Sequence, residues 1–204
     1  MPFKKLHSHL IETLENLEVD TPTPFQERSI PVIKSGANVF CIAPKDSGKT
    51  TTLILTTLQK LKCEAFGNTP RALIIVENKS EVLALYDAFI PFTKYSSLRV
   101  YASYEELHID VQKSEIYMGI DILITTPKTI QKLFLNNGVS TSALKICSID
   151  DAGFLIQQSA TTALTTTAES IKKCQYVVYA DELHPKIKRL NNFFMEAART
   201  VKTN

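Results

Sequence analysis

The segment from Ala43 to Thr50, with the sequence APKDSGKT, has the residue types of a phosphate-binding loop. It lies between an apolar run and a helical pattern, which is the setting that such a loop requires. Backbone N–H groups of the loop, including those of Ser47 and Gly48, would point toward phosphate oxygens. Lys49 would supply positive charge to the β- and γ-phosphates, and Thr50 a hydroxyl to Mg²⁺. The segment therefore predicts a site for a nucleotide phosphate chain.

Asp46 lies among the N–H groups that should face phosphate. Aspartate tolerates a left-handed backbone better than most residues, so the turn can form with it. Its charge opposes a phosphate, because like charges about 4 Å apart interact by roughly 4 kcal/mol at an effective dielectric near 20. Nucleotide affinity should therefore fall, unless the carboxylate points away or pairs with Lys45. A loop that keeps its shape but binds nucleotide poorly stays an open alternative.

Other catalytic and metal-binding patterns are weaker. His7 and His9 are two residues apart and cannot share a helix face, while His108 and His184 are isolated. The four cysteines are far apart and form no CxxC pair, which argues against a zinc site or disulfides and fits a reducing cytoplasm. No Ser/His/Asp spacing suggests a hydrolase triad.

Six short apolar runs are predicted to be the strands that position the loop. Several are apolar at consecutive positions, which is typical of strands covered on both faces of a parallel sheet. The runs are residues 38–43, 71–76, 98–102, 121–125, 144–149 and 175–180.

Helical patterns fill the gaps between these runs. Two short helices should precede the first strand, one with a leucine stripe from Leu6 to Leu17 and one that follows Pro24. Further helices are expected from the phosphate loop to about residue 61, around residues 82–89 and 130–134, and from Pro185 onward. The threonine-rich residues 161–167 should be a loop or a helix start.

This alternation predicts an α/β fold with a mostly parallel, doubly wound sheet flanked by helices. We expect one domain over residues 1–204, with the two leading helices in residues 1–36 and the α/β core in residues 37–204. No apolar run approaches the ~18 residues of a membrane span, so no membrane partner is expected.

The motifs and their order resemble the first RecA-like domain, a P-loop NTPase fold, of the DEAD-box RNA helicase family. Residues 21–26 (TPTPFQ) resemble the Q motif of that family, with Phe3 as the upstream aromatic. The resemblance implies that Gln26 reads the adenine edge while Phe3 stacks on the base. A carboxamide can both donate to and accept from adenine. The alternative is that residues 22–26 only cap a helix.

The same resemblance assigns Mg²⁺ and ATP to the loop. Apart from Asp46, the segment matches the phosphate motif, so the implied cofactor-binding residues are Phe3, Gln26, Ala43, Asp46, Ser47, Gly48, Lys49 and Thr50.

Residues 148–153 (SIDDAG) occupy the place of the Asp-Glu-Ala-Asp box. The resemblance implies that Asp150 holds Mg²⁺ through water, together with Thr50. Asp151 replaces the glutamate that orients and deprotonates the attacking water, and its side chain is shorter by one methylene, roughly 1.5 Å. Because small misplacements cost about a hundredfold in rate, weak hydrolysis by Lys49, Asp150 and Asp151 is expected.

The motifs that would contact RNA are also altered. Lys79 is the only basic group in residues 77–81, where the family has Pro-Thr-Arg-Glu-Leu. Thr126 and Pro127 are retained from a Thr-Pro-Gly-Arg stretch, and Lys128 follows them. Residues 179–181 (YAD) stand in place of the Ser-Ala-Thr motif that would couple hydrolysis to strand separation. The resemblance implies weak RNA contact through phosphates at Lys79, Thr126, Pro127 and Lys128, without base readout.

The net charge leaves the partner open, because 23 Lys and Arg face 21 Asp and Glu. A second RecA-like domain, with the arginine fingers and the other half of the RNA groove, is expected to be absent. The chain alone should therefore not unwind a duplex, and a partner protein could supply that domain.

Three functions stay open at this point. The first is an ATP-binding, RNA-associated helicase-like domain with weak or partner-dependent ATP hydrolysis. The second is a non-catalytic scaffold or protein-interaction module of the same descent that no longer binds nucleotide. The third is a small phosphoryl-transfer enzyme such as a nucleotide kinase, although five arginines leave little material for an Arg-rich lid.

Overall fold

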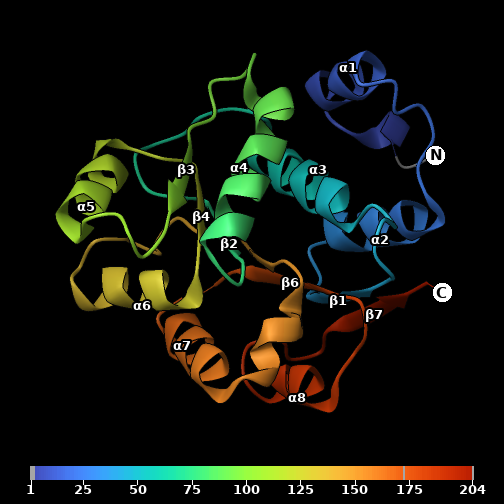
Figure 1. Cartoon of the computed structure of the whole chain (residues 1–204). Coiled ribbons are helices and arrows are strands. Elements are labelled where there is room, and N and C mark those ends of the chain that lie inside the picture. The colour runs from blue at the N-terminus through green and yellow to red at the C-terminus, as the bar shows by residue number, and fades with distance from the viewer. Residues whose placement is uncertain (1–2, 172, 204) are drawn as a thin grey trace.

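A computed structural model of the chain describes residues 3–171 and 173–203. Within these residues, seven parallel strands form one sheet, in the spatial order β3-β4-β2-β5-β6-β1-β7 (Figure 1). The strands are β1 (Val39–Ile42), β2 (Ala72–Ile75), β3 (Val100–Ser103), β4 (Ile122–Thr125), β5 (Ile146–Ile149), β6 (Gln175–Ala180) and β7 (Arg199–Lys202). The predicted α/β fold with a doubly wound parallel sheet is confirmed.

The sheet is covered by helices on both faces, because its central strands alternate buried side chains between two hydrophobic cores. On one face, Val39 and Cys41 of β1 pack in the first core with α1, α2, α3 and α4. On the other face, Phe40 and Ile42 pack in the second core with α5, α6, α7 and α8. The two groups of helices lie on opposite sides of the sheet in Figure 1.

The helices are mostly short, and several begin at side-chain caps. Thr23, Asn78 and Thr126 each accept a hydrogen bond from a first-turn N–H, at the starts of α2, α4 and α6. The helices are α1 (Ser8–Asn16), α2 (Pro24–Lys34), α3 (Lys49–Leu61), α4 (Lys79–Thr93), α5 (Ile109–Met118), α6 (Pro127–Leu135), α7 (Gln158–Glu169) and α8 (Pro185–Lys188).

The predicted final helix does begin at Pro185, but its expected extent is wrong. Helix α8 ends at Lys188, a 3-10 turn follows, and the chain returns to the sheet as β7 beside β1. Only Val201 of the four β7 residues is buried, so this edge strand has no apolar run in the sequence. A strand with one buried side chain leaves no periodic signal.

Residues 161–167 lie inside α7 rather than at a loop or a helix start. Threonine has a modest helix propensity, but here Leu164 and Thr167 are buried against the second core face. The hydroxyls of Thr165, Thr166 and Thr167 each donate to the carbonyl four residues earlier, at 2.8 to 3.0 Å. Tertiary packing therefore overrides the local preference.

A buried ionic cluster closes the amino edge of the sheet. Asp121, before β4, is fully buried and accepts hydrogen bonds from Arg71 at 2.7 Å, from Arg99 at 2.9 Å and from the Phe66 N–H at 3.1 Å. Burial opposes the ionisation of Asp121, but these hydrogen bonds outweigh it and hold its pKa below the ordinary value. The cluster joins the starts of β2, β3 and β4.

No helix among the described residues combines the length and apolar character needed to cross a lipid bilayer.

Candidate functional site

The carboxyl ends of all the strands meet at one edge of the sheet, because the sheet is parallel. At this edge β1, β6 and β5 are neighbours, with Ile42 paired to Ala180 and Ile149 paired to Val178. The phosphate-loop segment that follows β1 therefore lies beside Asp181, and Asp150 follows the next strand along. The topology brings together segments up to 138 positions apart in the chain (43 and 181).

The phosphate-loop segment is folded as a tight turn with two left-handed residues. Asp46 has φ 61° and Gly48 has φ 90°, and Gly48 is the N-cap of α3. A Cβ atom at Gly48 would come within 2.6 Å of the Gln26 amide nitrogen. The positive φ therefore favours glycine at position 48, and the close Gln26 side chain adds to this preference. Asp46 is exposed and adopts the conformation that aspartate tolerates.

The Lys49 ammonium is directed back into its own loop. Its Nζ donates to the carbonyl oxygens of Ala43 at 2.5 Å and Pro44 at 2.8 Å. It also forms an ion pair with Asp181 Oδ1 at 2.6 Å. Only 10% of the Lys49 side chain is exposed, against 41% for Asp181. Sequence reasoning did not find this ion pair, although the unusual acid after Ala180 was visible as a departure from the family motif.

The loop residues fit the phosphate chain of a nucleotide. The Ser47 hydroxyl is buried and has no hydrogen-bond partner among the described residues, so a polar group is expected to meet it. Thr50 is exposed in the first turn of α3, where its hydroxyl is accessible to a metal. Backbone N–H groups at the start of α3 add the polarity that phosphate oxygens need.

Gln26 joins the Q-motif segment to the phosphate loop. Its Oε1 accepts from the Thr23 N–H at 2.9 Å, and its Nε2 donates to the Gly48 carbonyl at 3.4 Å. The Thr23 hydroxyl donates to the Ser47 carbonyl at 2.7 Å. The helix-capping role of this segment is therefore present, as a capping box. Reading of adenine by Gln26 stays a prediction.

Phe3 lies in the first hydrophobic core, where 7% of the residue is exposed. Stacking of Phe3 on an adenine base would require the ring to leave this packing. The structure thus places Phe3 in the core, and its role toward a base stays a prediction.

The two carboxylates after β5 differ in environment. Asp150 is half-buried, and its Oδ1 accepts from the Asp151 N–H at 3.2 Å. Burial raises the pKa of Asp150 to about 6, and the negative charge of Asp151 acts in the same direction. Asp151 is exposed and has a left-handed backbone with φ 43°. Asp150 is thus the buried group, while Asp151 faces solvent.

No cluster of three or more His, Cys, Asp or Glu side chains within residues 3–171 and 173–203 could hold a metal ion. The role of Thr50 and Asp150 as ligands of Mg²⁺, which usually takes one or two protein oxygens together with phosphates and water, stays a prediction.

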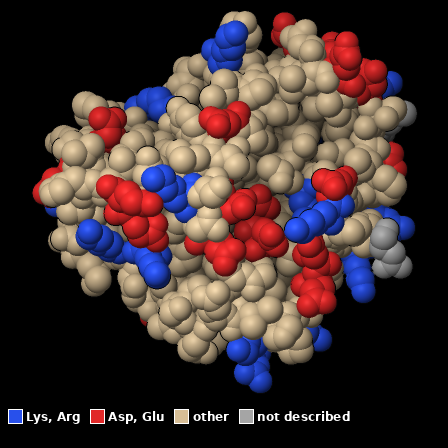
Figure 2. Space-filling model, in the orientation of Figure 1, with Lys and Arg blue, Asp and Glu red and all other residues tan. Residues whose placement is uncertain are grey.

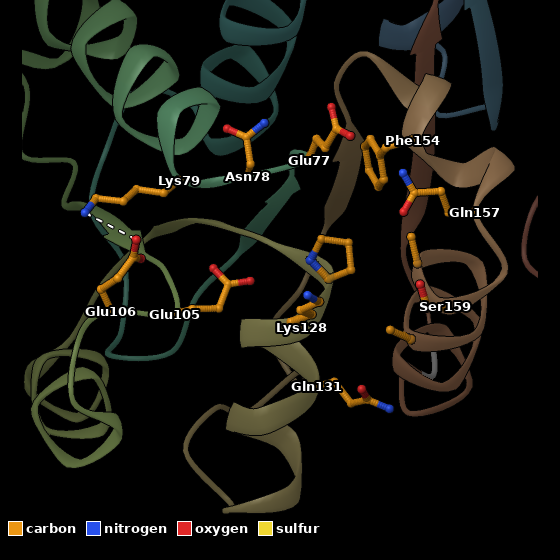
Figure 3. Close-up of a pocket in the computed structure, with 13 residues that line it drawn as sticks. Glu77, Asn78, Lys79, Glu105, Glu106, Lys128, Gln131, Phe154, Gln157 and Ser159 are labelled. Atoms are coloured by element: carbon orange, nitrogen blue, oxygen red, sulfur yellow. Dashed lines mark ion pairs between the residues drawn. The ribbon is translucent and has the colours of Figure 1, made fainter.

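The predicted RNA-binding residues surround a second part of the same edge, at the ends of β3, β4 and β2. A pocket of about 690 Å³ lies here, between the start of α4, the β3–α5 loop, α6 and α7 (Figure 3). Its charged lining residues are Glu77, Lys79, Glu105, Glu106 and Lys128. Three carboxylates thus face two amines. Figure 2 shows acidic side chains gathered near the middle of the face that it draws.

The pocket's carboxylates already engage two of the predicted RNA contacts. The Thr126 hydroxyl donates to Glu105 Oε1 at 2.8 Å, and Thr126 is fully buried. The Lys79 ammonium pairs with Glu106 at 3.4 Å, as the dashed line in Figure 3 marks. Pro127 is buried at the start of α6, whereas Lys128 is exposed. Of the four residues, Lys128 is the most accessible to a phosphate.

Gln112 was missed by sequence reasoning and holds the loop that carries these glutamates. It is 1% exposed, and its Nε2 donates to the carbonyls of Leu107 at 2.8 Å and Tyr104 at 3.2 Å. Its Oε1 accepts from the Ser103 hydroxyl. A single glutamine in a polar stretch carries no local signal, so only the fold reveals its role.

Sequence comparison assigns this chain to a known family. Residues 23–185 match the family described as DEAD/DEAH box helicase. Over 139 residues the chain is 32% identical to the pre-mRNA-processing ATP-dependent RNA helicase prp-5 of Neurospora crassa, which covers 67% of this chain and 12% of that protein.

Two solved structures share the fold. The yeast DEAD-box splicing factor Prp28 has a TM-score of 0.81 at 18% identity, over 94% of this chain and 48% of that chain. A DEAD box protein from the hyperthermophile Methanococcus jannaschii has a TM-score of 0.87 at 15% identity, over 96% of this chain and 53% of that chain. The chain thus spans about half of each. With residues 23–185 matched and the RecA-like fold in place, the chain belongs to the DEAD/DEAH box helicase family.

Proposed function

We propose that this chain is an ATP-binding, RNA-associated helicase-like domain with weak or partner-dependent ATP hydrolysis. The observation that carries the proposal is the turn with left-handed residues Asp46 and Gly48, in which the Ser47 hydroxyl has no hydrogen-bond partner among the described residues. The Ser47 hydroxyl would donate to a phosphate oxygen once its side chain turned toward the bound ligand.

Each residue has a chemical role in this proposal. The α3 N-terminus and Ser47 would bind phosphate oxygens, and Lys49 would place its charge at the β- and γ-phosphates. Thr50 and Asp150 would hold Mg²⁺, which when bound would neutralise charge on the phosphates. Asp151 would orient and deprotonate the attacking water. Asp151 is shorter than the glutamate that it replaces, so hydrolysis should be slow.

RNA contact in this proposal is weak and runs through phosphates. Lys128 is the accessible cation, while Lys79 and Thr126 are paired with glutamates. A partner that supplied a second RecA-like domain would add the opposite wall of the groove. We also propose a cytoplasmic location, which is consistent with four unpaired cysteine thiols in the described residues.

A second candidate function is a non-catalytic scaffold that keeps the fold and binds a protein. The ion pair between Lys49 and Asp181 and the contacts of Glu105 and Glu106 favour it, because they satisfy groups that ligands would otherwise meet.

Calorimetry with Mg-ATP separates the two candidates. We expect measurable binding by the wild-type chain and at least tenfold weaker binding by Lys49→Ala, about 1.4 kcal/mol or more. Lys60→Ala, at the other end of α3, removes the same charge and should leave the affinity unchanged. A folded wild-type chain that shows no heat with millimolar Mg-ATP would contradict the ATP-binding proposal and favour the scaffold.

A further inference from the structure

We propose that Asp181 sets the nucleotide affinity of this chain, because its carboxylate holds the Lys49 ammonium that the β- and γ-phosphates require. The inference rests on the proposed function and assigns Asp181 as a positioning residue that acts through Lys49. A nucleotide must exchange the carboxylate for its own phosphates in order to bind.

The sheet itself fixes the place of Asp181. The residue directly follows β6, which pairs with β1, and the Ala43 N–H donates to the Ala180 carbonyl at 3.1 Å. The first residue of the phosphate loop and Asp181 therefore lie side by side at the carboxyl edge. The contact between Asp181 and Lys49 follows from strand register and does not depend on a mobile segment.

The ammonium of Lys49 has three N–H donors, and three acceptors contact it. These are the Ala43 and Pro44 carbonyls and Asp181 Oδ1, at 2.5 to 2.8 Å. Two of the three belong to the loop and move only with it. Asp181 is the acceptor that a phosphate oxygen can replace without unfolding the turn.

The difference in exposure makes this exchange feasible. The Lys49 side chain is 10% exposed, so it needs an anionic partner, whereas the Asp181 side chain is 41% exposed and can return to water at little cost. Ion pairs with an exposed partner contribute modestly, so the carboxylate should weaken nucleotide binding without abolishing it. Once displaced, its charge still repels the phosphates nearby.

The experiment is calorimetry of Mg-ATP, Mg-ADP and AMP binding to wild type, Asp181→Asn and Glu182→Gln. Asn keeps the shape of the side chain but leaves Lys49 without a charged partner. We expect Asp181→Asn to bind ATP and ADP about three- to fivefold more tightly than wild type. AMP affinity should not change, because AMP has no β- or γ-phosphate for Lys49 to bind.

Glu182→Gln is the matched control, since it removes the exposed negative charge of the next residue, which forms no ion pair with Lys49 in the described residues. It should change ATP affinity less than twofold. An equal increase in ATP affinity in Asp181→Asn and Glu182→Gln would mean that net charge alone causes the tighter binding, and would overturn the inference.

A double-mutant cycle on the unfolding free energy, with Lys49→Ala and Asp181→Asn, tests the ion pair without nucleotide. Favourable coupling between the two positions supports the inference, and zero coupling refutes it. If wild type and Asp181→Asn bind ATP equally well, the inference fails while the proposed function stands. If neither wild type nor Asp181→Asn binds ATP, the inference and the proposed function both fail. Binding by Asp181→Asn alone would support the inference, while it would contradict ATP binding by the wild-type chain.

Discussion

At the scale of single residues, two carboxylates stand out at the candidate site. Asp181 pairs with Lys49 in the phosphate loop, and Asp150 is half-buried at the end of the neighbouring central strand. Burial raises the pKa of Asp150 to about 6, so this carboxylate is costly to keep ionised inside the fold. Such a carboxylate is well suited to meet a cation, because a bound metal offsets the cost of its charge.

We predict that Asp150→Asn stabilises the metal-free protein at pH 8 but not at pH 4. The pKa of Asp150 in the folded chain is about 6, above its ordinary value of 3.8, so folding favours the protonated form. Wild-type stability should therefore decline as the pH rises from about 4 to 6. The asparagine lacks this penalty, so its advantage at pH 8 should be about 3 kcal/mol.

Urea unfolding of both proteins in EDTA at pH 4 and pH 8 measures this difference. Asp151→Asn serves as the control, because it removes an exposed charge and asparagine also tolerates the left-handed backbone at this position. For this control, the difference in unfolding free energy from wild type should change clearly less between pH 4 and pH 8 than it does for Asp150→Asn. An Asp150→Asn advantage that is equal at both pH values would contradict the assignment of the raised pKa.

At the scale of elements, the site is built from the segments that follow parallel strands. The phosphate loop follows β1, Asp150 follows β5 and Asp181 follows β6, while the pocket of Figure 3 lies beyond β3, β4 and β2. The β3–α5 loop holds Glu105 against Thr126, and Gln112 fixes that loop through a hydrogen bond to the Leu107 carbonyl. Carboxylates thus lie both beside the phosphate loop and in the pocket, along one edge of the sheet.

We predict that the double substitution Glu105→Gln and Glu106→Gln strengthens RNA binding. It removes two negative charges from the pocket and releases the Lys79 ammonium from its ion pair. One further phosphate contact on single-stranded RNA should steepen the slope of log affinity against log salt by about 0.7. Fluorescence anisotropy with a labelled oligouridine, at salt concentrations from about 50 to about 200 mM, measures the affinity and its salt slope.

The matched control is Glu12→Gln with Glu15→Gln on α1, which changes the net charge equally at exposed positions. If the control pair strengthens RNA binding as much as the loop pair, the pocket is not where the RNA lies.

At the scale of the whole molecule, the candidate site and a buried ionic cluster lie at opposite edges of the sheet. The carboxyl edge carries the polar side chains of the site. The amino edge carries the buried cluster of Asp121 with Arg71 and Arg99, which ties the starts of three strands together. A parallel sheet allows this separation, since loops at one edge can vary while the other edge stays closed.

We predict that Asp121→Ala lowers the unfolding free energy by about 3–5 kcal/mol, because it leaves the buried Arg71 guanidinium without its carboxylate. Asp87→Ala, at an exposed position of α4, should change it by less than about 0.5 kcal/mol. Urea midpoints for both variants give the comparison, with Asp121→Asn as a milder substitute. A loss below about 1 kcal/mol in Asp121→Ala would show that the cluster is not stabilising.

Much of the framework could be predicted from the sequence, because its signals are local. Six strands were visible as apolar runs, and the phosphate loop as a short segment between a strand and a helix. Strand β7 was not, since one buried side chain, Val201, leaves no pattern. Helix α7 was not either, because burial of Leu164 and its neighbours outweighs the weak helix propensity of threonine.

The candidate site also has features that the sequence predicts and features that only the fold reveals. By itself, the sequence determined that the chain has a RecA-like framework, a phosphate loop with an aspartate in it and a carboxylate pair after a buried strand. Only the tertiary structure decided that Asp181 holds Lys49, 132 positions away, and that Glu105 holds Thr126. The physical reason is that strand order in a parallel sheet is set by packing of the whole core, and it alone determines which strand ends become neighbours.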